Sequence, residues 1–329
     1  MFTTTQFVLG LDLGGTKIAG GVVSYEGTLL SHVRLPTPAQ GVKKDVAALF
    51  DVAHAAVGAA KIGWGRISAV GVGVPGAFDP RSETVWAPNL PGWSKTPLKN
   101  LLEKALRRPT FVEGDRNMQA LAEAWLGAGA RNGARNLVLL TVGTGIGAGL
   151  ISEGRLIPGA HGVSGAAGWM VIDRRRNPEY ARVGCLEALG AGPAVARMGA
   201  RALKQNSRSL IGVLAKKNDG NITAEVVAEA ARRGDQAARQ VLREVGTNLG
   251  LGVANIVSLL NPEVVVVGGG LARIGNPLLV PLRRAMRQWG QPLATRQVRV
   301  VRSRLGDEAG ILGAARYAFL KLEEMKNVG

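Results

Sequence analysis

The sequence predicts a mixed α/β protein in which two related halves meet around a central cleft. Its 329 residues are 46% apolar and 20% charged, a composition typical of a folded globular protein. At about 100–200 residues per domain, this length suits two domains that share one cleft. Two glycine-rich segments of similar sequence lie half a chain apart, and strand patterns alternate with helical patterns through both halves. Together these observations indicate an internal duplication.

The two similar segments are each expected to form a hairpin. Residues 7–23 read FVLGLDLGGTKIAGGVV, and residues 136–152 read NLVLLTVGTGIGAGLIS. An alignment without gaps places Asp12 on Thr141, Gly14 on Gly143 and Ala19 on Ala148. In both segments two strand patterns flank a glycine-threonine turn, where backbone amides are left uncovered.

The other elements follow in order along the chain. In the first half we expect helices over 42–61 and 98–106, strands over 67–74 and 110–112, and then a helix that begins near Asn117. In the second half we expect helices over 186–203, 223–233, 235–260 and 308–324, and a fully apolar strand over 263–267. We predict a small α/β domain of residues 1–116 with 308–329, and a large α/β domain of residues 117–307.

Charge and cysteine content narrow the class of protein. The chain carries 41 basic and 24 acidic side chains, a net charge of +17, and most of the excess lies after residue 164. The one arginine triplet, at 174–176, has no helix-turn-helix pattern beside it, so a solvated basic surface is favoured over nucleic-acid binding. The single cysteine, Cys185, suits a reducing compartment. Because the sequence has neither a secretory signal nor a long unbroken apolar run, we expect a cytoplasmic protein without a membrane span.

Three glycine clusters have the character of phosphate or nucleotide sites. The residues are Asp12, Gly14, Gly15, Thr16 and Lys17 in the first turn, Gly143, Thr144 and Gly145 in the second, and Gly268, Gly269 and Gly270 after the apolar strand. They offer open amides, hydroxyl groups and a carboxylate suited to Mg²⁺. One such turn is a weak signal, since ordinary hairpins also contain glycine. Two related turns predict a clamp that closes on phosphate groups from both sides, and the P-loop and Rossmann fingerprints are missing.

Seven segments, in a fixed order and spacing, carry a family resemblance. They read LGLDLGGTKIAGGVV, GVGVPGAFD, APNLPGW, VEGDRNMQALAEAWLGAG, LTVGTGIGAGLI, GCLEALGAG and NPEVVVVGGGLA. They resemble the ROK family (repressors, open reading frames, sugar kinases), and bacterial glucokinases in particular, over essentially the whole chain. The resemblance implies a duplicated actin-like ATPase (ribonuclease H-like) fold. It also implies the use of ATP and Mg²⁺, with Asp12 holding the metal through the nucleotide.

The resemblance also assigns roles to single residues. The family's catalytic aspartate stands in an Asn-Asp-Ala-Asn pattern, which here reads Gly-Asp-Arg-Asn from Gly114 to Asn117. Taken alone, an aspartate at this place is most often a helix N-cap. The resemblance implies instead that Asp115 is the general base for an attacking sugar hydroxyl. Sugar contacts are implied for Gly76, Asn89 and Glu187, although the last two residue types are also common in turns and first helical turns.

The acceptor side departs from the family pattern. Where the family has Ala-Gly-Glu-x-Gly-His, residues 164–169 read SGAAGW, so Ala166 and Trp169 replace the sugar-binding glutamate and histidine. We therefore expect an altered acceptor pocket. His161, in the same loop, is a candidate sugar contact, and an ordinary loop histidine is the alternative.

The zinc motif of the family is also altered. Two of its three cysteine positions hold Pro178 and Tyr180, and Cys185 alone remains. Zinc in structural sites takes four nitrogen or sulfur ligands, so we expect no zinc site.

The sequence thus predicts an ATP-dependent kinase that phosphorylates a sugar or a sugar-like hydroxyl. The alternative is a non-catalytic sugar-binding or regulatory member of the same family. A DNA-binding repressor is disfavoured, because the first hairpin begins at residue 7 and leaves no room for a recognition domain before it. The identity of the acceptor stays open, as does ATP or polyphosphate as donor. We expect a homodimer that acts on a small molecule.

Overall fold

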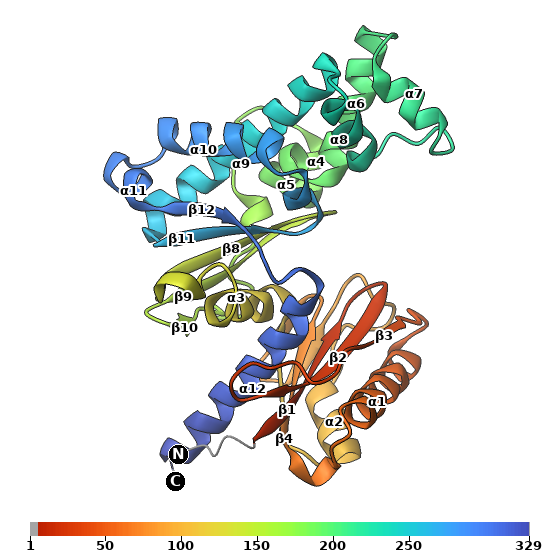
Figure 1. The fold of residues 1–329 in the computed structure, drawn as a ribbon, viewed down its shortest axis with the longest axis vertical. Helices are drawn as coiled ribbons and strands as arrows, with labels where there is room; N and C mark the ends of the chain where they lie inside the picture. The colour runs from red at the N-terminus through yellow and green to blue at the C-terminus, as the bar shows by residue number, and fades with distance from the viewer. Residues whose placement is uncertain (1–5, 329) are drawn as a thin grey trace.

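The computed structural model describes residues 6–328, which form two lobes stacked along the long axis of the molecule (Figure 1). Each lobe contains a five-stranded sheet, with strand order β3-β2-β1-β4-β7 in the first and β10-β9-β8-β11-β12 in the second. The strands of the first sheet are β1 (Phe7–Leu13), β2 (Lys17–Ser24), β3 (Val33–Pro36), β4 (Ile67–Val74) and β7 (Thr110–Gly114). Those of the second are β8 (Leu137–Val142), β9 (Ile146–Ser152), β10 (Arg155–Leu156), β11 (Val264–Gly268) and β12 (Arg299–Arg302). A small ribbon pairs β5 (Ala77–Asp79) with β6 (Thr84–Trp86).

Helices cover both faces of the two sheets. The α-helices are α1 (Val42–Ala59), α2 (Leu98–Leu106), α3 (Asp115–Trp125), α4 (Pro178–Val183), α5 (Cys185–Gly190), α6 (Gly192–Gln205), α7 (Leu210–Lys216), α8 (Ala224–Arg232), α9 (Gln236–Leu260), α10 (Asn276–Trp289), α11 (Pro292–Gln297) and α12 (Ala309–Val328). Short 3₁₀ turns are η1 (Trp64–Arg66), η2 (Ala130–Asn132), η3 (Ala167–Trp169), η4 (Gly270–Ile274) and η5 (Gly306–Glu308).

The central strands of both sheets are apolar on both faces because each sheet lies between helices. In the first lobe β1 and β4 pair in parallel, with α1 and α2 packed on one face and α12 on the other. In the second lobe β8, β11 and β12 are parallel, and the long helices α9 and α10 cover the outer face. Val264–Val267 is completely buried, which explains its unbroken run of valine.

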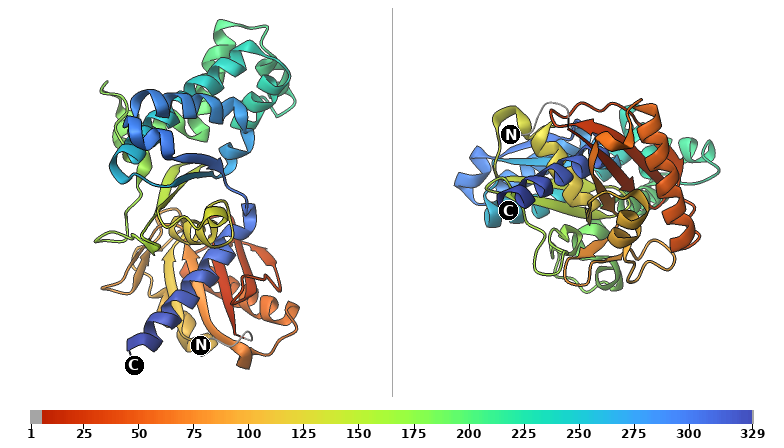
Figure 2. Two further views of the ribbon diagram at one scale, coloured as in Figure 1. Left: turned by 60° about the vertical axis from the view of Figure 1, so that its left-hand side comes forward. Right: turned by 90° about the horizontal axis from the view of Figure 1, so that it is seen from below.

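The two sheets are joined through α3 and α12, which pack against each other between the lobes (Figures 1 and 2). α3 lies on the second sheet and α12 lies on the first. The helix α12 approaches the sheet so closely that a Cβ atom on Gly10 or Gly71 would overlap its backbone. Glycine is therefore required at these two strand positions for the contact to form.

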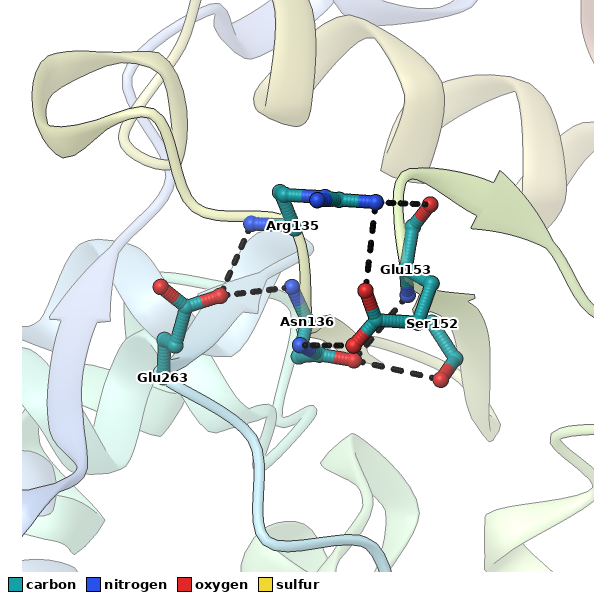
Figure 3. A network of polar contacts seen from close by, with 5 residues as sticks. All are labelled: Arg135, Asn136, Ser152, Glu153 and Glu263. Carbon is teal, nitrogen blue, oxygen red and sulfur yellow. Dashed lines mark hydrogen bonds and ion pairs between the residues drawn. The ribbon is translucent and has the colours of Figure 1, made fainter.

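A polar network holds together the end of the second sheet that lies away from the glycine turns (Figure 3). One carboxylate oxygen of Glu263 accepts hydrogen bonds from the backbone amides of Arg135 and Asn136, both at 2.8 Å. The side-chain oxygen of Asn136 accepts hydrogen bonds from the Ser152 hydroxyl and from the Glu153 amide. These contacts join the starts of β8 and β11 to the end of β9, so the hairpin is fixed at its base.

Both predicted hairpins are confirmed, but the alignment between them is wrong by one residue after the turn. Asp12 faces Ala19 across the first hairpin, whereas Thr141 faces Gly147, and not Ala148, across the second. The reason is that the two turns differ in length. The first turn spans residues 14–17, the last of which is the first residue of β2. The second turn is closed by a hydrogen bond from the Gly143 amide to the carbonyl of Gly145. A one-residue difference in a turn moves the whole following strand relative to its counterpart.

Several element boundaries differ from the predicted ones. The helix predicted over 186–203 is two helices, α5 and α6, because the backbone of Ala191 is extended and Pro193 follows inside the first turn of α6. The strand predicted over 110–112 continues to Gly114, and the helix predicted near Asn117 begins at Asp115. The elements α4, α7, α10, α11 and β12 carried no prediction. The predicted domain boundary at 116/117 falls inside α3, and the division into domains stays a prediction.

Candidate active site

A cavity of about 450 Å³ opens between the two lobes, on the side where the strands of both sheets end. It is lined by residues that are far apart in the sequence: Pro75, Gly76, Trp86, Pro88, Asn89, Asp115, Arg116, Thr141, Gly145, Ile146, Gly147, Ala166, Trp169 and Glu187. We call it the acceptor cavity. Four of the five residues with a predicted catalytic or sugar-binding role line it, namely Asp115, Gly76, Asn89 and Glu187.

Asp115 is fixed at the point where β7 passes directly into α3. The N-cap is Gly114, so Asp115 is the first residue of the helix rather than its cap. The buried Glu113 side chain bonds to residues before and after Asp115. It accepts hydrogen bonds from the Gly114 amide at 2.7 Å and from the Asn117 side chain at 3.0 Å. One carboxylate oxygen of Asp115 accepts a hydrogen bond from the Arg116 amide. The backbone before and after Asp115 is thus held by its neighbours.

Asp12, at the end of β1, lies close to Asp115. A Cβ atom on Gly73, in the neighbouring strand, would be 3.4 Å from Asp12 Oδ1 and 3.8 Å from the Asp115 Cα atom. Burial, reinforced by the charge of Asp115, raises the pKa of Asp12 to about 7. Burial also raises the pKa of Asp115, and the Arg116 cation opposes that rise. Two desolvated carboxyl groups therefore share one end of the first sheet.

Three backbone amides in the two hairpin turns have no acceptor within the described chain. Among residues 6–328, the amides of Gly15, Thr144 and Gly145 have no backbone or side-chain acceptor. A Cβ atom on Gly15 or Gly143 would meet nothing within 4 Å, so both turns are open on their outer side. Uncovered amides at a tight turn form a concavity that suits an anion.

The third glycine cluster lies at a separate cavity of about 420 Å³. Gly268, Gly269 and Gly270 line this cavity, and so do several of residues 302–309. Gly269 has a φ of +80°, and a Cβ atom there would overlap the carbonyl of Val142 at the end of β8. The positive φ and the close approach both require glycine. The cluster therefore brings the end of β11 against the end of β8.

Glu187 connects the second turn to the wall of the acceptor cavity. It lies in the first turn of α5, and its Oε2 atom accepts a hydrogen bond from the Ile146 amide at 2.7 Å. A Cβ atom on Gly145 would be 2.8 Å from the same oxygen. Any side chain at Gly145 would therefore displace Glu187.

Two predicted site residues lie elsewhere. His161 is exposed and is not part of the lining of the acceptor cavity. Lys17 forms an ion pair with Asp307 at 3.3 Å, and Arg34 pairs with the same carboxylate at 3.2 Å. The roles assigned to His161 and Lys17 stay predictions.

The cavity also contains residues that the sequence did not single out as site residues. Arg116 lies against β9, where a Cβ atom on Gly147 would be 2.7 Å from its Nη1 atom. Its guanidinium has no hydrogen-bond or ion-pair partner in the described part of the chain. Trp86 and Trp169 line the cavity while remaining 53% and 57% exposed. A signal for Arg116 was present, since it replaces the alanine of the family's aspartate pattern.

The loop that resembles an altered zinc motif is closed by side-chain hydrogen bonds. The Tyr180 hydroxyl donates to Asp173 Oδ2 at 2.8 Å, and the Arg175 side chain donates to both carboxylate oxygens. The Arg175 amide and the Tyr180 hydroxyl hold the pKa of Asp173 below its usual range. Within residues 6–328, no group of three or more His, Cys, Asp and Glu side chains is placed to bind a metal ion. The absence of zinc stays a prediction.

None of the helices within residues 6–328 combines the length and the apolar character that a membrane span needs.

The ROK family matches residues 8–320 of the chain. A glucokinase of Thermotoga maritima is 34% identical over 94% of this chain and 96% of that protein. The crystal structure of a ROK family glucokinase from Streptomyces griseus, in complex with glucose and AMPPNP, is 32% identical and superposes with a TM-score of 0.76 over 95% of this chain and 99% of that one. A xylose repressor of Caldicellulosiruptor bescii is 28% identical over 93% of this chain and 76% of that protein. Enzymes and a repressor thus share this fold, the two-domain actin-like ATPase fold that the sequence predicts.

Proposed function

The chain belongs to the ROK family, and we propose that it transfers the γ-phosphoryl group of ATP to a hydroxyl group of a sugar. One observation carries the proposal: Asp115 lines an open cavity between the lobes, beside the second glycine turn and opposite Asn89. A general base has to lie where it reaches the acceptor hydroxyl, and this cavity offers that place. The similarity to glucokinases over nearly the whole chain supports the same conclusion.

The two turns supply the phosphate side of the reaction. The open amides at Gly15, Thr144 and Gly145 are suited to bind the phosphate oxygens of the nucleotide from both lobes. Asp12 is the residue that would hold Mg²⁺, because its desolvated carboxylate has no hydrogen-bond donor in the described chain and lies beside the first turn. When bound, the metal ion neutralises charge on the phosphate groups.

Asp115 supplies the proton acceptor. As the sugar oxygen attacks, its proton passes to the carboxylate of Asp115, and a raised pKa makes this carboxylate a stronger base than an exposed aspartate. Glu113 and Asn117 act on the backbone around Asp115 and hold it in place. Closure of the lobes would exclude water from the reacting groups.

By this proposal, one region of the acceptor differs in structure from glucose. Ala166 leaves space in the cavity wall, and the exposed rings of Trp86 and Trp169 offer flat apolar surfaces on opposite lobes. Indole rings stack on the apolar faces of sugars and on aromatic groups. We therefore propose an acceptor with a larger or less polar substituent than a simple hexose has.

The second candidate function is sugar binding without catalysis, as in a regulator. The similarity to a xylose repressor favours it, because that protein matches most of this chain. The retained Asp115, together with two open turns, favours the kinase.

The test is a screen of acceptors with the purified protein, ATP and Mg²⁺. Hexoses, amino sugars, polyols and aryl glycosides are each incubated with wild-type protein and with Asp115→Asn, and the phosphorylated product is identified by mass. A product that forms only with the wild type supports the kinase. Sugar binding detected by calorimetry, with no product from ATP or from polyphosphate, would instead support the regulator.

We expect the enzyme to work in the cytoplasm as a homodimer. Light scattering coupled to size-exclusion chromatography tests the dimer, since a mass near one chain of 34.4 kDa would contradict it.

A further inference from the structure

Five arginines line a further cavity, in the second lobe. This cavity of about 500 Å³ is formed by Arg131, Arg283, Arg299, Arg302 and Arg304, together with Ala128, Val301 and Ser303. We call it the arginine pocket. No residue in its lining is acidic. It lies at β12, the edge strand of the second sheet, and shares no residue with the acceptor cavity.

None of the five guanidinium groups has an acidic partner within residues 6–328. Arg283 donates two hydrogen bonds to the carbonyl of Val300, and so is fixed on the edge of β12. The side chains of Arg131, Arg299, Arg302 and Arg304 have no hydrogen-bond or ion-pair partner anywhere in residues 6–328. Like charges that converge in one hollow repel one another, and an anion in their midst removes that cost.

The nearby carboxylates are already engaged. Glu123 accepts hydrogen bonds from Ser303 at one oxygen and from the Ala128 amide at the other. Asp307 pairs with Lys17, Arg34 and Arg273. Neither acid lines the arginine pocket. The positive charge there is therefore available to a ligand.

The arginine pocket continues toward the third glycine cluster. Arg302, Ser303 and Arg304 also line the cavity of about 420 Å³ that contains Gly268–Gly270. The two cavities thus share a wall, but Glu123 and Asp307 line only the cavity of the third glycine cluster, so the uncompensated positive charge lies on the side of the arginine pocket.

We propose that the arginine pocket binds a small oligophosphate, a ligand with several linked phosphate groups, outside the acceptor cavity. Guanidinium groups form paired hydrogen bonds with the oxygens of phosphates and carboxylates, and a chain of linked phosphates brings several such anionic groups close together. Arginines from three places in the chain, η2, α10 and residues 299–304, surround one hollow, so they suit several phosphate groups better than one. A nucleic-acid duplex presents its phosphates on a convex rod and would need a basic stripe rather than a hollow.

The experiment measures tripolyphosphate binding by titration calorimetry with the full chain and saturating AMPPNP, which occupies the nucleotide site. One bound tripolyphosphate per chain is expected, with an affinity that falls as salt is added. The variant Arg299→Gln, Arg302→Gln, Arg304→Gln is expected to lose about a hundredfold in affinity, given the strength of charge-assisted bonds. The control Arg174→Gln, Arg176→Gln, Arg296→Gln removes the same charge from exposed positions and should bind as the wild type does.

Several results would overturn the proposal: equal losses in the two triple variants, competition by AMPPNP that abolishes binding, orthophosphate binding as tightly as tripolyphosphate, or a single-stranded oligonucleotide binding more tightly than tripolyphosphate. If the triple variant does not fold, Arg302→Gln and Arg131→Gln are each expected to weaken binding about tenfold, and unchanged binding in both would contradict the proposal. Arg131→Gln and Arg299→Gln change residues that line the arginine pocket but not the cavity of the third glycine cluster. These two variants should keep the ATP-dependent activity, so a failure of the sugar-kinase proposal is measured separately.

Discussion

The two sides of the cleft are made from different parts of the chain. The proposed phosphate side consists mainly of backbone, the open amides of Gly15, Thr144 and Gly145, together with the carboxylate of Asp12. The acceptor side consists of side chains, among them Trp86, Asn89 and Trp169. Backbone amides offer the same chemistry in any sequence that keeps the turn, whereas side chains change with each substitution. By our proposal, therefore, phosphate binding tolerates changes of sequence that keep the two turns, whereas the choice of acceptor changes with single side chains.

Asp115 borders both sides, so its loss should have the largest effect. We expect Asp115→Asn to lower kcat/KM by about 10²–10⁴-fold, the usual contribution of a positioned general base. Nucleotide affinity should be retained, because the turns are untouched. Steady-state kinetics and nucleotide titration measure the two quantities.

Asp51→Asn is the matched control, since Asp51 is exposed on α1 in the first lobe. Activity at the wild-type level in Asp115→Asn would refute the assigned role.

A side chain introduced into the second turn should weaken nucleotide binding and leave the acceptor side unchanged. Gly143→Val places a branched side chain where a Cβ atom meets nothing within 4 Å, in the space that phosphate groups would fill. We expect nucleotide affinity to fall by about a hundredfold, since amides that are blocked from an anion lose charge-assisted bonds. Calorimetry with AMPPNP measures it.

Gly58→Val, on the exposed face of α1, is the control, because a Cβ atom there also meets nothing. Gly145→Val is a poorer choice, since it would also displace Glu187 on the acceptor side. A folded Gly143→Val protein that binds AMPPNP normally would contradict the clamp.

Restoring two residues of the family pattern should change the acceptor side alone. We expect Ala166→Glu with Trp169→His to raise kcat/KM for glucose about tenfold or more, because a buried sugar hydroxyl without a partner costs about 1–3 kcal/mol. Nucleotide affinity should not change. Trp289→His, at an exposed tryptophan far from the cleft in sequence, controls for the loss of an indole.

The alternative is that Trp169 merely fills space left by the metal loop. Its 57% exposure does not favour that view. Wild-type phosphorylation of glucose with a micromolar KM would show that the acceptor side is not altered in function.

The paired carboxylates should cost stability in a way that depends on pH. The pKa of Asp12 rises from 3.8 to about 7 on folding, so between these values the unfolded chain has lost a proton that the folded chain keeps. Stability is therefore lost as pH rises from 3.8 toward 7. We expect Asp12→Asn to be more stable than the wild type by up to about 4 kcal/mol at pH 8. The two proteins should become equally stable below pH 4.

Urea unfolding at both pH values, without nucleotide or metal, measures this difference. A variant that is less stable than the wild type at pH 8 would mean that the Asp12 carboxylate is not strained by burial.

The smallest effect is expected at the loop behind the acceptor side. Tyr180→Phe removes the hydroxyl that bonds Asp173 and should lower the free energy of unfolding by about 0.5–1.5 kcal/mol. A chelator should change neither protein, if a hydrogen bond holds the loop where the family pattern has zinc. Loss of stability on chelation, with zinc found by metal analysis, would contradict this.

The sequence predicted the fold well where local pattern and tertiary burial agree. The run Glu263–Val267 and the helix Leu98–Leu106 were placed within a residue, because strong apolar patterns and clear breakers bound both. The strand β12 was missed, because arginines stand at both ends of only two valines. Charged residues are frequent on edge strands, where they hide a strand pattern while protecting the open edge.

The site was predictable only in part. Asp115, Asn89 and Glu187 came from a resemblance in ordered motifs, and the structure does bring them to one cavity. Trp86 belongs to no motif, and the one signal for Arg116 is that it replaces an alanine of the family pattern. The contact of Arg116 with Gly147, and the shared cavity of Trp86 and Trp169, depend on how the lobes stack. The register of the second hairpin depended on the length of one turn, which a glycine-rich sequence does not specify.

The packing of α12 bears on how the protein is made. Residues 309–328 cover one face of the first sheet, whose strands β1 and β4 leave the ribosome long before that helix is synthesised. The elements of the second sheet, by contrast, are all complete once β12 has emerged. Because domains tend to fold as units during synthesis, the first sheet has to wait with one apolar face bare until the last helix arrives. The lobe that is translated first is therefore the one whose folding finishes last.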